Sequence, residues 1–377
     1  MNKLLKNIKK FFKDTIKKVQ NSKFYNTKFM LTVRKLFGNR LFSVLFFGII
    51  IYLYLVFADT GSIFFVLRRS IYIIVPLTLV AFGGLYSERS GIVNIALEGI
   101  MVFGAFVGIL FMVKLQENGV NGQMLYVYSI LIAGLAGGLF SLIHAFALIN
   151  MKANQVISGT ALNLLAPALA LFFIKIIFGG EDIVFQDSFL IQEMGFLSKI
   201  PVLGEIFFTK TYLSTFYAIV IIIVASIALY KTKFGLRLRA CGEHPHAADA
   251  AGVNVNRMRY YGVFISGILA GIGGIVMIIP IDVAFRGTAS GYGFLALAVL
   301  ISGQWRPFRI VIVAAFFGFM LNLSGAYTSI GFLSKAGLPD KFYSMIPFFM
   351  TLIVLAFTSR NSQAPKAAGE PYDPGKR

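Results

Sequence analysis

The chain has 377 residues, of which 57% are hydrophobic, 15% are aromatic and only 14% are charged. Soluble globular proteins carry about 25% charged residues, so this composition excludes a soluble domain. Apolar runs near or above about 18 residues recur along the chain, which predicts a polytopic membrane protein. The formal net charge of +19 suggests nucleic acid at first sight. However, most basic residues lie near the N-terminus or in short loops between apolar runs, as in membrane proteins, so we expect no nucleic acid partner.

Residues 1–40 form a basic extension with twelve Lys or Arg and a single acid, Asp14. Its segment LLKNIKKFFKDTIKKVQ places apolar residues at helical spacing with lysines between them. This pattern predicts an amphipathic cytoplasmic helix that lies on anionic membrane lipids. The alternative is a basic tail that only orients the first span.

Hydropathy predicts an all-α permease domain over residues 41–358, with about ten membrane spans and broken or re-entrant helices. An even number of spans places both termini on one side, and the distribution of Lys and Arg makes that side cytoplasmic. Residues 359–377 are then a cytoplasmic tail. The predicted spans lie near residues 41–58, 70–84, 91–113, 125–149, 156–178, 212–229, 261–281, 293–304, 309–330 and 342–358.

Two of these spans look interrupted. The span near 70–84 is short, contains Pro76 and ends in two glycines, and the span near 293–304 has only about a dozen residues. Short spans broken by Gly or Pro are where unwound backbone lines a polar cavity in transporters. We therefore expect both segments to border a substrate path.

The stretch GGLYSERSGIVNIALEGIM (83–101) carries polar residues between two apolar runs. Asn94 and Glu98 are four residues apart and so share a helical face. An acid inside a membrane span is a functional hypothesis by default, because burying a charge there costs at least about 2.5–3.5 kcal/mol. Two interpretations stay open: both residues line the path, or Glu98 is a structural tie to backbone N–H groups and Arg89. Further path candidates are Ser158, Asn163 and Asn322.

Two segments between spans are long. The external loop, residues 179–211, mixes acidic and apolar residues and suits either a docking site for an external partner or a simple connection. The inner loop, residues 231–260, contains GEHPHAADAAG between basic residues. Proline at the first turn, several alanines and a terminal glycine predict a two-turn helix with a smooth face that can dock on another protein. The candidate docking residues are Gly242, Glu243, His244, Pro245, Ala248, Ala250, Ala251 and Gly252.

The motifs of nucleotide hydrolysis and of common enzymes do not occur in this sequence. It contains no GxxxxGK[ST], HExxH or GxSxG pattern, one cysteine and three scattered histidines. We therefore expect no enzyme activity, no metal and no cofactor bound by this chain. Transport against a gradient would need an ion or another subunit as its energy source.

Several sequence segments resemble those of a known protein family. FGLRLRACGEHPHAADAAGVNV resembles the cytoplasmic coupling segment of ABC importer permeases of the branched-chain amino acid/ribose/nucleoside type, and GGLYSERSGIVNIALEGIMVFGAF resembles that family's early spans. QVISGTALNLLAPAL (155–169) and APKAAGEPYDPGKR (364–377) resemble the nucleoside-uptake branch. The likeness covers roughly residues 62–377, and the basic N-terminal extension is longer than is usual in that branch.

The resemblance implies a permease in the plasma membrane of a bacterium that works by alternating access. It implies a second related permease subunit, a cytoplasmic ATPase subunit that hydrolyses ATP, and an external substrate-binding lipoprotein. Nucleosides are the implied substrates.

Other functions remain open from the sequence. The same architecture could import ribose or another simple sugar. An ion-coupled secondary transporter usually has acids in several spans, whereas Glu98 is the one clear intramembrane acid here. A membrane enzyme is disfavoured because no nucleophile–base pair or metal-ligand set can be assembled.

Overall fold

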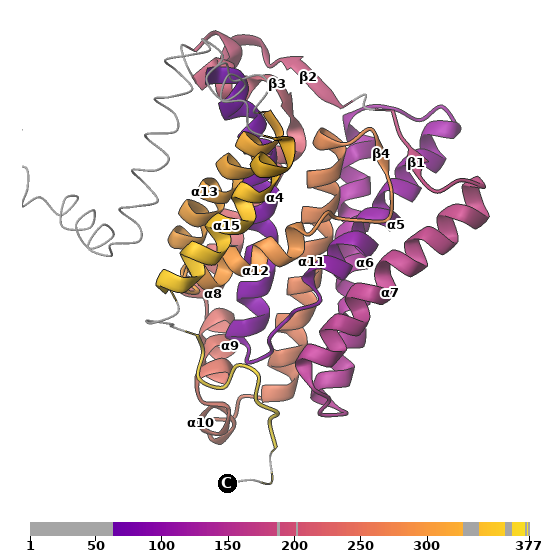
Figure 1. Ribbon diagram of the computed structural model, residues 1–377. Coiled ribbons are helices and arrows are strands. Elements are labelled where there is room, and N and C mark those ends of the chain that lie inside the picture. Colours follow the sequence, from indigo (N-terminus) through magenta and orange to yellow (C-terminus); the bar gives the residue numbers. More distant parts are fainter. Residues whose placement is uncertain are drawn as a thin grey trace, which may run out of the picture. The chain divides into compact units, whose positions relative to one another are not determined.

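The computed structural model describes residues 63–186, 189–200, 203–326, 339–358, 364–373 and 375. The predicted extension 1–40 and the predicted span 41–58 lie outside the described residues. The rest is mainly helical (Figure 1). Its helices are α4 (Ile63–Arg89), α5 (Leu97–Glu117), α6 (Gln123–Ile149), α7 (Gln155–Phe178), α8 (Leu213–Lys231), α9 (Lys233–Glu243), α10 (Pro245–Ala250), α11 (Val255–Ile281), α12 (Tyr292–Ser302), α13 (Pro307–Ala326) and α15 (Asp340–Thr358).

Six helices of the described part are long and apolar enough to cross a membrane. They are α4, α5, α6, α7, α8 and α11. The prediction of a multi-pass helical membrane protein is therefore confirmed, while the total of ten spans and the side on which each terminus lies stay predictions.

Helix α11 forms the centre of the bundle and packs against α4, α5 and α6. Small residues permit this close contact. A Cβ on Gly271 would lie 2.3 Å from the carbonyl oxygen of Ala133 on α6, and a Cβ on Gly267 would lie 2.5 Å from that of Gly137. The backbones of α6 and α11 thus touch almost directly, which is how membrane helices gain packing energy without a hydrophobic driving force.

Helices α7 and α8 lie outside this centre and expose large apolar side chains. Leu164 and Ile157 on α7 are 73% and 70% exposed, and Val224 on α8 is 58% exposed. In a membrane such surfaces face lipid tails or another membrane subunit rather than water.

The predicted external loop contains most of the β-structure. Strand β1 (Ile183–Val184) pairs with β4 (Ala284–Phe285), and β2 (Leu190–Glu193) pairs with β3 (Thr209–Tyr212), both antiparallel. In register, Ile183 faces Phe285 and Leu190 faces Tyr212. Two short helical turns, η2 (Gly195–Lys199) and η3 (Gly204–Phe208), complete the loop. Figure 1 shows these strands at one end of the bundle and α9 and α10 at the other.

The prediction of an interrupted span near 70–84 is wrong. Helix α4 runs without a break through Pro76 and both glycines to Arg89. Gly83 and Gly84 serve packing instead: a Cβ on Gly83 would lie 2.8 Å from the Ser266 carbonyl oxygen of α11. The interruption comes later, at residues 90–96, so the predicted span 91–113 begins as a helix only at Leu97. The segment near 293–304 is a short helix, as predicted: the eleven-residue α12. Whether it spans a membrane stays a prediction.

Candidate substrate path and coupling surface

The non-helical residues 90–96 between α4 and α5 form the α4–α5 break. Its first turn is closed by α4, because the Ser90 N–H donates to the Ser87 carbonyl (3.0 Å) and the Gly91 N–H donates to the Glu88 carbonyl (3.0 Å). Gly91 has a φ of +99°, a left-handed conformation that side chains with a Cβ rarely adopt. Glycine is therefore required at this turn.

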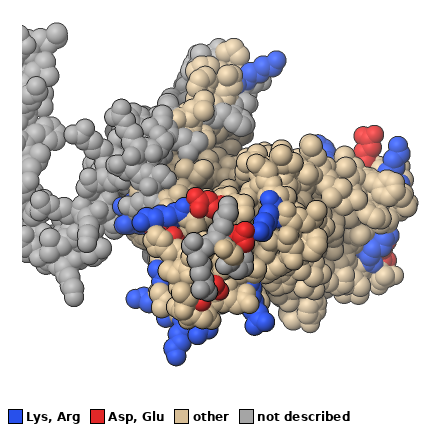
Figure 2. Space-filling view, turned by 90° about the horizontal axis from the view of Figure 1, so that it is seen from below, with Lys and Arg blue, Asp and Glu red and all other residues tan. Residues whose placement is uncertain are grey.

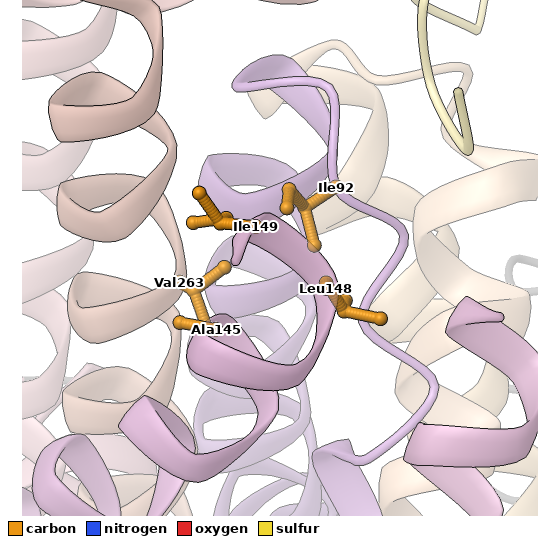
Figure 3. Packing of buried hydrophobic residues seen from close by; sticks show 5 residues of the cluster. All are labelled: Ile92, Ala145, Leu148, Ile149 and Val263. Atoms are coloured by element: carbon orange, nitrogen blue, oxygen red, sulfur yellow. The ribbon is translucent and has the colours of Figure 1, made fainter. Parts of the chain in front are cut away.

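Ile92 holds the α4–α5 break in place through apolar packing. Its side chain is fully buried between the C-terminal end of α6 and α11, as Figure 3 shows. The cluster consists of Ile92, Ala145, Leu148, Ile149 and Val263, with Tyr260 packed against it. The break is thus an ordered, packed segment, although it has no regular secondary structure.

Asn94 and Glu98 join the α4–α5 break to two different helices. The buried Asn94 donates from Nδ2 to Ser266 Oγ on α11 (2.9 Å) and accepts the Ala96 N–H at Oδ1 (3.1 Å). Glu98, 8% exposed, accepts the N–H groups of Gly291 (2.8 Å) and Gly293 (2.6 Å). These N–H groups belong to the start of α12, where a helix leaves donors unpaired and favours negative charge. The carboxylate therefore ties the N-terminus of α12 to that of α5.

Asn163 ties α7 to the same segment. Its Oδ1 accepts the Gly99 N–H (2.8 Å), and its Nδ2 donates to the Ile95 carbonyl (2.9 Å). Ser158 lies more than a turn earlier on α7, and its hydroxyl bonds Nδ1 of His144 on α6 (2.8 Å). The structure therefore brings Asn94, Glu98 and Asn163 together around residues 94–99, with partners within the chain for each. Whether any of them meets substrate stays a prediction.

Asn322 is the exception among the path candidates, since it lies beside the other end of α4. It is 2% exposed, and its Nδ2 donates to the Val66 carbonyl (2.8 Å) and to Ser70 Oγ (2.8 Å). Its Oδ1 is buried and has no hydrogen-bond partner among the described residues. An unsatisfied buried acceptor costs about 1–3 kcal/mol. Asn322 borders a cavity of about 490 Å³, which we call the far cavity.

Sequence reasoning did not connect Glu88 and Arg89 with Trp305. Glu88 is 4% exposed and accepts a hydrogen bond from Trp305 Nε1, while Arg89 Nη2 donates to the Trp305 carbonyl (3.0 Å). Tyr230 of α8 donates to the same carbonyl (2.9 Å). Trp305 is buried, so it links the end of α4 to the segment after α12. The unusual charges at 88–89 were a visible signal, but a partner so distant in the sequence cannot be found from spacing.

The inner loop forms two helices, α9 and α10. The predicted docking helix is present as a helix: α10 has proline at its first turn, and Gly252, with φ +79°, follows its end. Ala248 faces inward and is 5% exposed, whereas Ala250, Ala251 and Gly252 are exposed. Gly242 and Glu243 end α9, and His244 joins the two helices. The exposed face of α10 is therefore smooth and available for contact.

Helix α9 packs directly on the α4–α5 break. A Cβ on Gly242 would lie 2.3 Å from the Arg89 carbonyl oxygen and 3.1 Å from the Gly91 nitrogen. Thr232 caps α9 by accepting the Gly235 N–H (3.1 Å). Helix α9 therefore contacts the backbone of the break without an intervening side chain.

The residues 364–373, which we call the tail segment, cross the same region. The Ala367 N–H donates to the Gly242 carbonyl (2.9 Å), and the Gly369 N–H donates to the Gly91 carbonyl (3.2 Å). Arg259 of α11, 2% exposed, donates from Nη1 to the Glu370 carbonyl (3.0 Å). The tail segment therefore binds the inner loop, the break and α11 through its backbone.

Charged side chains of both signs surround this end, which Figure 2 shows from below. Lys366 approaches Glu243 (4.0 Å), and Lys152 pairs with Asp373 (3.3 Å). All four side chains are well exposed, so each ion pair contributes little to the stability of the fold. In the described part of the chain, no group of three or more His, Cys, Asp and Glu side chains is placed to hold a metal ion.

An apolar helix bundle with six helices in its described part that could cross a membrane, buried polar ties and a short internal helix is the architecture of a multi-pass membrane protein. The chain belongs to the family described as branched-chain amino acid transport system, permease component, which matches residues 66–355. Permease subunits of this kind are not enzymes in themselves and bind no cofactor themselves. The family implies an ATPase and a substrate-binding partner.

Three relatives align over most of the chain. The guanosine ABC transporter permease protein NupQ of Bacillus subtilis is 44% identical, over 80% of this chain and 94% of that protein. The nucleoside ABC transporter permease protein NupC of Lactococcus lactis is 42% identical, over 79% and 93%. The putative glucose ABC transporter permease protein TsgC13 of Haloferax volcanii is 30% identical, over 78% and 91%. No solved structure gives a significant match.

Proposed function

We propose that the chain is the membrane-spanning subunit of an ABC importer for nucleosides. Its similarity to a guanosine permease and a nucleoside permease, each above 40% identity over most of both chains, supports this substrate class. The weaker similarity to a glucose permease supports a simple sugar as the second candidate.

The observation that carries the mechanism is the packing of α9 on the α4–α5 break. We propose that a separate ATPase docks on the exposed face of α10 and hydrolyses the ATP, with no nucleotide site in this chain. Movement of α10 then shifts Gly242 against the Arg89 backbone. Since Glu98 ties α5 to α12, the shift reaches the short internal helix and opens the path alternately to each side.

The remaining partners are assigned to surfaces of suitable chemistry. A substrate-binding lipoprotein would meet the end that carries the external loop, residues 179–211. A second, related permease would cover part of the exposed apolar faces described above. Among the path candidates, we assign Asn94 and Asn163 to holding residues 94–99, Glu98 to tying α5 to α12, and Ser158 to tying α7 to α6, since each is hydrogen-bonded within the chain.

Uptake of labelled guanosine by the complete complex tests the substrate class. We expect ATP-dependent uptake that unlabelled nucleosides compete and ribose or glucose does not. Competition by sugars alone would favour the second candidate. Uptake that follows a proton or sodium gradient without the ATPase would contradict the importer altogether.

Two substitutions test the coupling surface. Ala250→Arg adds bulk and charge to the exposed face, and Gly252→Trp adds bulk at a position with positive φ. Both should leave the protein in the membrane while uptake is lost and ATP hydrolysis no longer responds to substrate. Val120→Arg, at an exposed site between α5 and α6, is the control. Normal uptake in both coupling variants would count against the mechanism.

A further inference from the structure

The far cavity lies between α4, α11, α12 and α13, at the end of the bundle away from α10. Its volume of about 490 Å³ suits a small organic molecule. The residues that matter here are Phe65, Arg69, Tyr72, Tyr292, Asn322 and Gly325. They combine aromatic rings, a cation and an amide. The rest of the lining consists of a second cation, Arg68, and the apolar residues Ile73, Pro280, Ile281 and Leu321.

Asn322 is among the residues that line this cavity, and its amide oxygen is buried at the cavity wall. Its Nδ2 donates to the backbone carbonyl of Val66. Because a carbonyl can only accept a hydrogen bond, this contact fixes which side of the amide carries the nitrogen and which carries the oxygen. That oxygen has no partner among the residues that the structure describes. A ligand with an N–H or O–H group would satisfy it.

The aromatic rings of the far cavity include one that is held in place. The Tyr72 hydroxyl donates to the Lys210 carbonyl, and the Tyr72 ring meets that of Tyr212 edge-on at 5.4 Å between centroids. Tyr292, the first residue of α12, lines another wall of the cavity, and Phe65 is 44% exposed. Flat bases stack on such rings with little dependence on base identity.

We propose that the far cavity is a binding site for the nucleoside before it crosses the membrane. The base stacks on the aromatic wall, and a base N–H or ribose O–H donates to Asn322 Oδ1. This assignment rests on the proposed nucleoside import and adds to it the place where the substrate is first held by this subunit. Because Arg68 and Arg69 both line the cavity, a nucleotide is the competing ligand, which the test includes.

Substituted cysteine labelling tests this site directly, because the one native cysteine, Cys241, is buried. In Gly325→Cys the new side chain enters open space, since no described atom lies within 4 Å of its Cβ. A membrane-impermeant thiol reagent is applied to the complete complex in membranes. With guanosine at ten times its Kd, about one site in ten stays free, so labelling should slow about tenfold. Val184→Cys, 70% exposed at the same end but outside the cavity, should show no protection.

A second variant separates binding from folding. Asn322→Leu should raise the KM for guanosine about tenfold, with normal amounts of protein in the membrane. Combined with Gly325→Cys, it should reduce the protection by guanosine at the same concentration from about tenfold to about twofold, because a tenfold higher Kd leaves about half of the sites free.

The outcomes distinguish this site from the proposed function. Unprotected labelling in membranes that take up guanosine would overturn the site but leave the proposed function standing. Protection by guanosine monophosphate but not by guanosine would also overturn it. Absence of guanosine uptake in the unmodified complex would instead refute the proposed function.

A different set of contacts carries a second inference, on the tail segment. A cavity of about 430 Å³ lies between α10 and the tail segment and is lined by both. The backbone bond of Ala367 holds the tail segment on Gly242 of the inner loop, and that of Gly369 holds it on Gly91 of the break. Lys366 and Glu370 remain exposed. We infer that α10 and the tail segment form one composite surface for the ATPase.

Retention of the ATPase during purification of the complex tests this surface. Gly369 has φ +88°, so Gly369→Val strains the tail segment and displaces its N–H from Gly91. We expect several-fold less ATPase retained, whereas Gly375→Val, at a site without positive φ, should retain the normal amount. Lys366→Glu should lower retention without any backbone strain. Normal retention in both tail variants, with loss in Ala250→Arg, would refute the composite surface and spare the proposed function.

Discussion

The α4–α5 break and the far cavity both place asparagine amides inside the bundle, but they use them differently. Asn94 and Asn163 each bond through both the oxygen and the nitrogen of the amide, and so fix the backbone around residues 94–99. Asn322 bonds only through its nitrogen within the described residues and keeps a buried oxygen beside a cavity. A polar residue in a membrane helix is therefore a poor guide to substrate contact by itself. Spare hydrogen-bonding capacity beside a cavity is the better criterion.

The largest effect is expected at Glu98. Glu98→Ala leaves the buried Gly293 N–H without an acceptor, at a cost of about 1–3 kcal/mol, and also removes the acceptor of the partly buried Gly291 N–H. We expect a strongly reduced amount of the complex in membranes and a lower melting temperature, measured on purified complex. Glu98→Gln should show a milder form of the same loss, with a normal KM for guanosine in the protein that remains.

Glu117→Ala is the matched control, because Glu117 is an exposed acid on the same helix whose ion pair is with Lys114. It should change neither the amount nor the melting temperature. A normal amount of Glu98→Gln protein with an altered KM would place Glu98 in contact with substrate and break the comparison.

A smaller loss is expected at Asn163, which is only partly buried. Asn163→Ala removes the bonds to Gly99 and Ile95, and should lower the melting temperature without changing the KM. Asn118→Ala, an exposed asparagine whose side chain bonds the Lys114 carbonyl, should have little effect on either. A raised KM with an unchanged melting temperature would show that Asn163 belongs to the path rather than to the break.

Ligand-dependent stability sharpens the contrast at Asn322. A ligand that binds only the folded state stabilises it by about 2.7 kcal/mol at 100 times its Kd. Guanosine should therefore raise the melting temperature of the unmodified complex and of Asn163→Ala. In Asn322→Leu, where we expect about tenfold weaker binding, the stabilisation at the same concentration should fall to about 1.4 kcal/mol. Equal shifts in all three proteins would remove Asn322 from the binding site.

The smallest effect concerns Cys241, which lies in α9 outside the membrane spans. Burial raises the pKa of the Cys241 thiol to about 11, although Arg259 opposes this shift. This pKa difference contributes to the free energy of unfolding. The contribution is fully present below the ordinary thiol pKa of about 8.5 and is lost as the pH rises through 11. Cys241→Ala should remove that part of the alkaline decline in the free energy of unfolding. The unmodified chain should show negligible thiol labelling at neutral pH, and rapid labelling of the folded chain would contradict the burial of Cys241.

Several features followed from the sequence because they depend on local rules. Apolar length predicted the spans from 125–149 to 261–281, and Pro245, the alanines and Gly252 predicted α10. The interruption near 70–84 was misplaced because glycine has two uses in membrane helices. At Gly83 it permits close packing on α11, whereas at Gly91 it permits positive φ, and the sequence does not distinguish these uses.

Composition alone determined that this is a multi-pass helical membrane protein, because the energy of placing side chains in lipid depends mainly on their chemistry. The motifs determined the permease resemblance and the helix α10, since both depend on consecutive residues. Only the tertiary structure decided that Glu98 accepts hydrogen bonds from the start of α12 and that Trp305 donates one to Glu88. The same holds for the amide oxygen of Asn322, which has no hydrogen-bond partner in the described part of the chain. These outcomes depend on which distant groups come within hydrogen-bonding distance, and that distance exists only after the helices have packed.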